Sequence, residues 1–235
     1  MNYISLIEEL KKRGSVPGLD AIEGLLEELG HPEDNLKVVH IAGTNGKGSI
    51  FAYLSSILIA AGFKVGRYIS PTISCYEERF QINGEYITKD ELARLYNIVE
   101  EAMKREEEKT GLKPTLFEVE TAISFLYFKE EKVDYALIEV GMGGRMDATN
   151  VIRHPELTVI SSISYDHQAF LGDTLEEIAW QKAGIIKESC PVVLSENSDE
   201  VCKVIEQEAT KKKVKCISVD IFLAYIKNFC LVHRY

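Results

Sequence analysis

Apolar and polar residues follow two spacings along this chain, and each spacing predicts a type of element. Apolar positions at a helical period predict helices, and short β-branched runs between them predict strands. Asn83-Gly84, between two alternating segments, predicts a tight hairpin. The expected helices are Tyr3–Lys12, Asp20–Leu29, Ser49–Ala61, Lys89–Lys109, Leu116–Glu130, Thr174–Lys187 and Asp199–Lys212. The expected strands are Val38–Ala42, Lys64–Ile69, "YALIEVG" from Tyr135, Leu157–Ser161, Pro191–Leu194 and Val214–Val219.

Strands separated by helices of this length predict an α/β fold, with a mostly parallel sheet and helices on both faces. In such sheets, ligands bind at the carboxyl ends of the strands. The polar and glycine-rich segments of this chain fall at those ends: after Ala42, after Ile69, at Glu139 and after Ser161. We therefore expect one site, built from loops that follow different strands.

Composition excludes several classes of protein. The chain has 37 acidic and 27 basic residues, and a net charge of -10 argues against nucleic acid as the main partner. Neither a signal-peptide segment nor a run near the ~18 apolar residues that span a bilayer is seen, which predicts a cytoplasmic protein without a membrane partner. The five cysteines are odd in number and lack CxxC spacing, which favours reduced structural thiols over disulfides or zinc.

The segment "GTNGKGS" follows the first expected strand and has the parts of a phosphate-binding loop. Gly43, Gly46 and Gly48 allow backbone N–H groups to surround phosphate oxygens, Lys47 supplies charge, and Ser49 supplies a hydroxyl for Mg²⁺. The spacing is shorter than in GxxxxGK[ST], so a glycine-rich turn with a solvent-facing lysine stays an alternative. We interpret the segment as a P-loop in which Lys47 binds the outer phosphates of a nucleoside triphosphate.

The shortened loop resembles the ATP site of the Mur ligase superfamily, and "HIAGTNGKGS" is similar to its folate branch, the folylpolyglutamate and dihydrofolate synthases. Further matching blocks are "GLDAIEGLLEELGHPEDNLKVVH", "YISP", "EERFQINGEYI", "IEVGMGGRMDATNVI" and "SSISYDHQAFLGDTLEEIAWQKAGIIK". The resemblance implies a ligase that uses ATP and Mg²⁺ to phosphorylate a carboxylate of folate or dihydropteroate. The amino group of L-glutamate would then displace the phosphate to give an amide.

Residue chemistry and the resemblance together give a set of candidate ligands. The loop residues Gly43, Thr44, Asn45, Gly46, Lys47, Gly48 and Ser49 would bind nucleotide. Ser49 and Glu139 fit Mg²⁺ because it prefers hard oxygen ligands, and the resemblance adds Ser70 and, for a second ion, His167. Alternatives are a turn hydroxyl for Ser70, a salt-bridge partner for Glu139 and a loop residue for His167.

The resemblance also assigns catalytic and acceptor residues. Lys47 and His167 would act in catalysis with Lys182, which matches a lysine that is commonly carbamylated in the superfamily; the alternative is a surface lysine on its helix. The acceptor residues would be Thr115, Phe117 and Asp147, since an aromatic ring can stack on a pterin and an acid can pair with its edge. Core packing of Phe117 and capping by Asp147 are the alternatives.

The sequence departs from the family in two ways. Thr72 and Gln181 stand where relatives generally have histidine and glutamate, and the family continues into a second α/β domain. We therefore expect an incomplete ATP-binding domain over residues 1–220, a missing C-terminal domain, and an apolar tail over 221–235 that could pair chains. Weak or no amide synthesis by this chain alone would follow.

Two other functions stay open: a nucleotide-binding module without ligase activity, and a Mur ligase for a UDP-linked precursor. The sequence leaves undecided whether dihydropteroate or a reduced folate is the acceptor, how many glutamates are added, and which oligomer forms.

Overall fold

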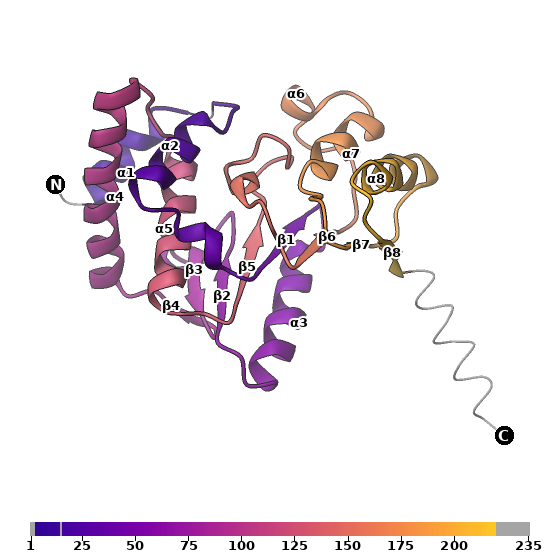
Figure 1. Ribbon diagram of the computed structural model, residues 1–235, viewed down its shortest axis with the longest axis horizontal. Coiled ribbons are helices and arrows are strands. Elements are labelled where there is room, and N and C mark those ends of the chain that lie inside the picture. Colours follow the sequence, from indigo (N-terminus) through magenta and orange to yellow (C-terminus); the bar gives the residue numbers. More distant parts are fainter. Residues whose placement is uncertain (1–2, 15, 220–235) are drawn as a thin grey trace.

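The computed structural model describes residues 3–14 and 16–219, and a sheet lies at its centre (Figure 1). Within those residues the sheet has eight strands in the order β4-β3-β2-β5-β1-β6-β7-β8. The six strands from β2 to β8 in that order are parallel, whereas β3 and β4 form an antiparallel hairpin at one edge. The strands are β1 (Val38–Ala42), β2 (Val65–Tyr68), β3 (Phe80–Ile82), β4 (Glu85–Tyr86), β5 (Tyr135–Glu139), β6 (Leu157–Ile160), β7 (Val192–Leu194) and β8 (Cys216–Ser218). The predicted mostly parallel α/β fold is confirmed.

Alternation along the strands divides the core between the two faces of the sheet. On β1, Val38 packs into the larger cluster, while Val39 and Ile41 pack on the opposite face with Phe51 of α3. Helix α3 (Lys47–Ala60) covers that opposite face, and Figure 1 shows it apart from the other long helices. The larger cluster is formed with α1 (Tyr3–Lys11), α2 (Asp20–Glu28), α4 (Lys89–Thr110) and α5 (Leu116–Glu130).

The far half of the sheet has its own core. Ile160 of β6 pairs in register with Ala42, and it packs with Val192 and Leu194 of β7. Helices α7 (Leu175–Ala183) and α8 (Asp199–Lys211) supply the other buried residues of this cluster except Ile186, which follows α7. Three short 3₁₀ helices, Pro32–Asn35, Tyr76–Arg79 and Ala148–Val151, connect elements within the described residues.

Several element boundaries differ from the predictions. The hairpin is confirmed, with Asn83 and Gly84 both at positive φ (51° and 87°). Helix α7 was predicted to reach Lys187 but ends at Ala183, because the backbone then tightens to three-residue hydrogen bonds such as Gly184 N–H to Gln181 O. The single-turn helix α6 (Gln168–Leu171) was not predicted, since one turn is too short to show a period.

Among residues 3–14 and 16–219, no helix is both long enough and apolar enough to cross a bilayer. The cytoplasmic location stays a prediction. Residues 221–235, predicted to form an apolar tail that could pair chains, lie outside the described residues.

Candidate functional site

The predicted phosphate-binding loop connects the buried strand β1 to the N-terminus of α3. Gly43 and Gly46 have φ values of 144° and 86°, which favour glycine. A Cβ atom on Gly43 would lie 1.7 Å from Oγ of Ser161, so a side chain at this position would overlap the neighbouring loop. The loop conformation therefore depends on glycine at 43 for two separate reasons.

The segment after β6 holds this loop from the side. The Thr44 N–H donates to Ser162 O at 2.8 Å, and Ser161 N–H donates to Ala42 O at 2.9 Å. The Thr44 hydroxyl donates to Ser164 O and lies 3.2 Å from Ser164 N, which donates back to it. These bonds join two segments about 120 residues apart in sequence, so the loop is fixed before any ligand binds.

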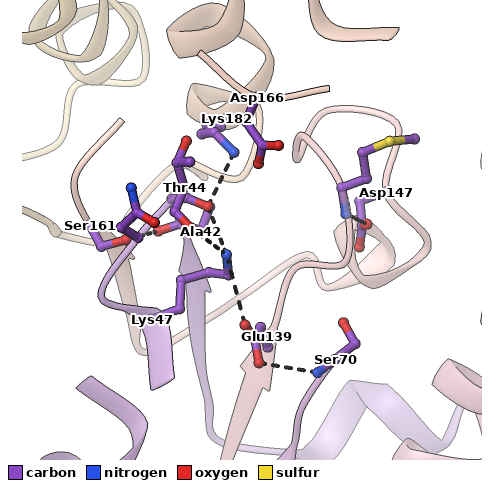
Figure 2. A network of polar contacts seen from close by, with 12 residues as sticks. Ala42, Thr44, Lys47, Ser70, Glu139, Asp147, Ser161, Asp166 and Lys182 are labelled. Carbon is purple, nitrogen blue, oxygen red and sulfur yellow. Dashed lines mark hydrogen bonds and ion pairs between the residues drawn. The ribbon is translucent and has the colours of Figure 1, made fainter. Parts of the chain in front are cut away.

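Lys47 is the first residue of α3, and its ammonium group lies inside the loop. Lys47 Nζ donates to Gly43 O at 2.9 Å and to Thr44 O at 3.3 Å, and it lies 3.8 Å from Oε1 of Glu139 (Figure 2). Ser49 follows two residues later, exposed at the start of the helix. A cation held only by carbonyls and a distant carboxylate, beside a helix N-terminus, can turn to phosphate oxygens without breaking a close ion pair.

Glu139 ends β5 beside that lysine, and its side chain is nearly buried. Its Oε2 accepts from Ser70 N–H at 3.1 Å, which places the predicted metal ligands Ser70 and Glu139 together. Burial raises the pKa of Glu139, whereas the Ser70 N–H and the charges of Lys47 and Arg67 lower it. A divalent cation would stabilise this buried carboxylate, and the oxygen donors present suit Mg²⁺. Among the described residues, no group of three or more His, Cys, Asp and Glu side chains could hold a metal ion. A metal site here would therefore also need hydroxyl or other oxygen donors.

Lys182, near the end of α7, meets the same carbonyl from the other side. Only 3% of its surface is exposed, and Nζ donates to Gly43 O at 3.2 Å. Burial, together with the charge of Lys47, lowers the pKa of Lys182 to about 8, while Asp166 and Asp147 act in the opposite direction. The alternative of a surface lysine is therefore wrong. An amine with this pKa is partly neutral at physiological pH, which carbamylation requires.

His167 lies at the start of α6 with its side chain half exposed. The residue is in the left-handed region (φ 46°), and Nε2 lies 3.5 Å from Oδ1 of Asp166. Asp166 extends toward Lys182 in Figure 2. This places His167 on the loop that borders the site, and its role as a metal ligand stays a prediction.

Of the three predicted acceptor residues, Asp147 belongs to the loop that follows β5, and Phe117 packs against that loop at Gly141. Thr115 forms a capping box with Glu118 at the start of α5, and both residues are buried. The ring of Phe117 packs below Gly141, where an added Cβ would lie 2.5 Å from it. Asp147 is also buried and caps a 3₁₀ turn. All three have structural partners, and their binding of a pterin stays a prediction.

Sequence reasoning did not identify Ser161, Asp166 or Thr149 as parts of the site. Ser161 excludes any side chain at Gly43, and Asp166 faces Lys182. Thr149 bonds to Asp147 at 2.6 Å. The signal available was the density of polar residues in "SSISYD" and "DATN", which lie inside two of the quoted blocks.

Comparison with known proteins gives one consistent family. Residues 41–222 match the Mur ligase middle domain. The chain is 45% identical over 201 residues to the dihydrofolate synthase/folylpolyglutamate synthase of Bacillus subtilis, an alignment that covers 85% of this chain and 46% of the relative. It is 40% identical over 197 residues to the folylpolyglutamate synthase of Lacticaseibacillus casei, covering 82% and 46%.

Solved structures agree with these matches. The apo form of L. casei FPGS has a TM-score of 0.87 at 35% identity, covering 93% of this chain and 54% of that one. The folylpolyglutamate synthase of Thermotoga maritima has a TM-score of 0.83 at 40% identity, covering 92% and 49%. The chain spans about half the length of the curated relatives it matches.

Proposed function

The chain belongs to the Mur ligase middle domain family, and we propose that it carries the nucleotide-binding part of an ATP-dependent ligase. In this reaction the ligase adds L-glutamate to a carboxylate of folate or dihydropteroate through an acyl phosphate. Its relatives include proteins named for folylpolyglutamate and dihydrofolate synthesis, and one similar solved structure is an FPGS–AMPPCP–folate complex. The observation that carries the proposal is that Lys47 and Lys182 converge on the carbonyl of Gly43.

The chemistry of phosphoryl transfer explains why this arrangement suits the reaction. Negative charge on the transferred phosphoryl group must be neutralised, and the ammonium group of Lys47 would do so. Backbone N–H groups at the N-terminus of α3 add positive potential for the phosphates. Mg²⁺ would bind through Ser49, Ser70 and Glu139 and would supply further positive charge at the phosphates. His167 is the proposed ligand of a second ion.

The remaining roles follow from the same proposal. Lys182 would act beside the phosphates, as a carbamate or as an amine. Phe117, Thr115 and Asp147 would lie near the pterin of the acceptor. Folate or dihydropteroate and L-glutamate are then the small-molecule partners, and the second candidate function is nucleotide binding without amide synthesis. This candidate is favoured by the internal bonding of the acceptor residues, which contrasts with the exposed loop residue Ser49.

Calorimetric titration of MgATP tests the nucleotide part directly. We expect Lys47→Ala to weaken binding by roughly 10- to 100-fold, because the variant loses a charged hydrogen-bond donor to phosphate. Lys12→Ala, which removes one positive charge from an exposed position near the end of α1, is the matched control and should bind like the parent. Equal affinity of the parent and Lys47→Ala would contradict the proposed loop.

Phosphate release tests the ligase part in the same samples. Release that requires both dihydropteroate or a reduced folate and L-glutamate supports the ligase, and the acceptor that works identifies the substrate. Lys47-dependent binding without release supports the second candidate. Release that requires a UDP-linked acceptor instead would contradict the folate assignment and support the peptidoglycan alternative.

A further inference from the structure

Three buried side chains, His40, Thr149 and Asp147, form a hydrogen-bonded chain next to the candidate site. His40, in the middle of β1, has its Nε2 atom 2.8 Å from Oγ1 of Thr149. The same Oγ1 lies 2.6 Å from Oδ1 of Asp147, which also accepts from Thr149 N–H at 3.0 Å. None of the three residues exposes more than 6% of its surface. The chain therefore links the strand that leads into the phosphate-binding loop to the loop that follows β5.

Hydrogen-bond accounting fixes the protons in this chain. Burial raises the pKa of Asp147, whereas its hydrogen bonds from Thr149 and from Met142 N–H lower it. Thr149 has a single hydroxyl proton, and the carboxylate of an ionised Asp147 can only accept, so the proton of Thr149 then points to Asp147. His40 must then donate to Thr149 through Nε2–H, which leaves Nδ1 as a bare acceptor. That Nδ1 atom is buried without a hydrogen-bond partner. Burial, with help from the charge of Lys187, lowers the pKa of His40 to about 3, so the ring is neutral at physiological pH.

Asp147 holds the glycine-rich loop of residues 141–146 in place. Its Oδ2 accepts from Met142 N–H at 2.8 Å, so one carboxylate fixes both ends of the loop. The loop in turn packs against α7. Arg145 N–H donates to Gln181 O at 2.8 Å, and a Cβ on Gly144 would lie 2.9 Å from Gln181 O and 3.0 Å from Lys182 O. The backbone of α7 next to Lys182 therefore rests directly on this loop.

These contacts close a circuit. It runs from His40 along β1 to Gly43, across the 3.2 Å bond to Lys182, through the backbone of α7 to the loop, and back through Asp147 and Thr149. We propose that His40 and Thr149 are positioning residues. They fix the distance between β1 and the loop after β5, and so place the amine of Lys182 against the phosphate-binding loop. The inference rests on the proposed function only for the chemical use of Lys182; the placement itself is a property of the fold.

Reactivity of the Lys182 amine measures this placement without any ligase activity. Lys47 faces the amine from α3, Asp166 from the segment before α6, and Asp147 from the loop. Labelling with acetic anhydride at a series of pH values, followed by peptide mass spectrometry, gives the midpoint of its deprotonation. In the parent we expect a midpoint near pH 8, because the pKa of buried Lys182 is lowered to about 8.

Paired variants of Thr149 separate the hydroxyl from the fold. Thr149→Val keeps the shape but removes both hydrogen bonds of the hydroxyl, so the loop should loosen, water should reach the amine, and the midpoint should rise by about one pH unit or more. Thr149→Ser keeps the hydroxyl and should keep the parent midpoint. His40→Leu should raise the midpoint as Thr149→Val does. His40→Gln can still donate to Thr149, so its midpoint should lie closer to that of the parent.

A destabilised control shows whether any loss of stability has the same result. Leu92→Ala opens a cavity in the larger cluster beneath α4, which packs against α1, α2 and α5, and should lower stability without moving the Lys182 midpoint. An unchanged midpoint in Thr149→Val and His40→Leu, or an equal shift in Leu92→Ala, would overturn the proposal. MgATP titration of the parent reports on the proposed function separately. If the parent does not bind MgATP, the proposed function is refuted, while the labelling result still decides the positioning.

Discussion

Two regions beside the carboxyl end of β5 satisfy their polar groups in opposite ways. On the phosphate side, residues 43–49, the ammonium groups of Lys47 and Lys182 share one carbonyl, Gly43 O, and Ser49 is exposed. On the acceptor side, residues 115–118 and 141–149, polar groups pair with one another. Thr115 Oγ1 donates to Glu118 at 2.7 Å, and Asp147 accepts from Thr149 and Met142.

We interpret this difference as separating groups that can exchange their bonds for a ligand from groups that hold the fold. A cation bonded to carbonyls can exchange those bonds for phosphate oxygens, so its removal should mainly weaken nucleotide binding. A buried carboxylate with three internal donors loses those bonds on substitution, so its removal should mainly lower stability. The comparison would fail if substitutions on the phosphate side mainly lowered stability, or if substitutions on the acceptor side left stability unchanged.

The largest expected effect on stability is at Gly43. This residue is an exception on the phosphate side, where substitutions should otherwise mainly weaken nucleotide binding. Gly43→Ala would force a Cβ atom to within 1.7 Å of Ser161 Oγ and would place alanine at a φ of 144°. We expect a loss of about 3–5 kcal/mol in the free energy of unfolding, together with loss of MgATP binding. Urea unfolding measures the first and calorimetry the second.

A second substitution divides the two causes at Gly43. Gly43→Ala combined with Ser161→Gly removes the overlap with the serine side chain but keeps the backbone strain and a 3.1 Å approach to the backbone N of residue 161, so its stability should lie between those of the parent and the single variant. A single variant as stable as the parent would show that the contact with Ser161 does not constrain the loop.

Asp147 gives the next largest effect and tests the acceptor side. Asp147→Ala leaves the donors of Thr149 and Met142 N–H without their acceptor, and we expect a loss of about 3 kcal/mol in unfolding free energy. Thr115→Ala, which removes only a helix cap, should cost about 1 kcal/mol. Should Asp147→Ala remain as stable as the parent and lose only acceptor binding, Asp147 would belong with the ligand-binding residues.

Lys182 supplies a pH-dependent test. Its pKa is lowered to about 8 in the folded chain, below the ordinary lysine value, so between those values the unfolded chain binds more protons and stability from this group rises with pH. The charged amine is thus destabilising below pH 8, by about 3 kcal/mol from a shift of this size. Lys182→Met should be more stable than the parent at pH 7 by about 2 kcal/mol, after allowing for the lost hydrogen bond to Gly43 O.

The advantage of Lys182→Met should shrink as the pH rises from 8 toward 10, because the parent amine is then neutral in the folded chain while the unfolded chain approaches the ordinary lysine pKa. Unfolding free energies of the two proteins at pH 7, 8, 9 and 10 measure this. Lys64→Met, at a partly exposed lysine paired with Glu131, is the control and should show no such advantage at pH 7. A constant difference across the series would mean that Lys182 is not charged and desolvated in the folded chain.

The smallest effect is expected at Gly48, five residues from Gly43. A Cβ on Gly48 meets no atom within 4 Å, and the residue lies in the first turn of α3. Gly48→Ala should therefore be neutral or stabilising by up to about 1 kcal/mol, because alanine loses less backbone entropy than glycine. Destabilisation comparable to that of Gly43→Ala would contradict the open space at this position.

Much of the fold could be predicted from local patterns. The long helices and the central strands follow from periodicity, and the hairpin follows from Asn83-Gly84. The loop "GTNGKGS" could be predicted to bind phosphate because its glycines, lysine and serine are adjacent in the chain. The end of α7 and the helix α6 were not predicted, since each is decided by a single turn whose hydrogen bonds depend on packing.

The sequence by itself determined the α/β class and the family, and it predicted the phosphate-binding loop, because those signals are local or lie in quoted blocks. Only the tertiary structure decided that Lys182 meets Gly43 across 139 residues and that Asp147 turns inward to Thr149. The reason is the strand order β5-β1-β6, which brings the carboxyl ends of three distant strands together. Contacts across such a junction depend on which strands become neighbours, and hydrophobic periodicity carries no information about that order.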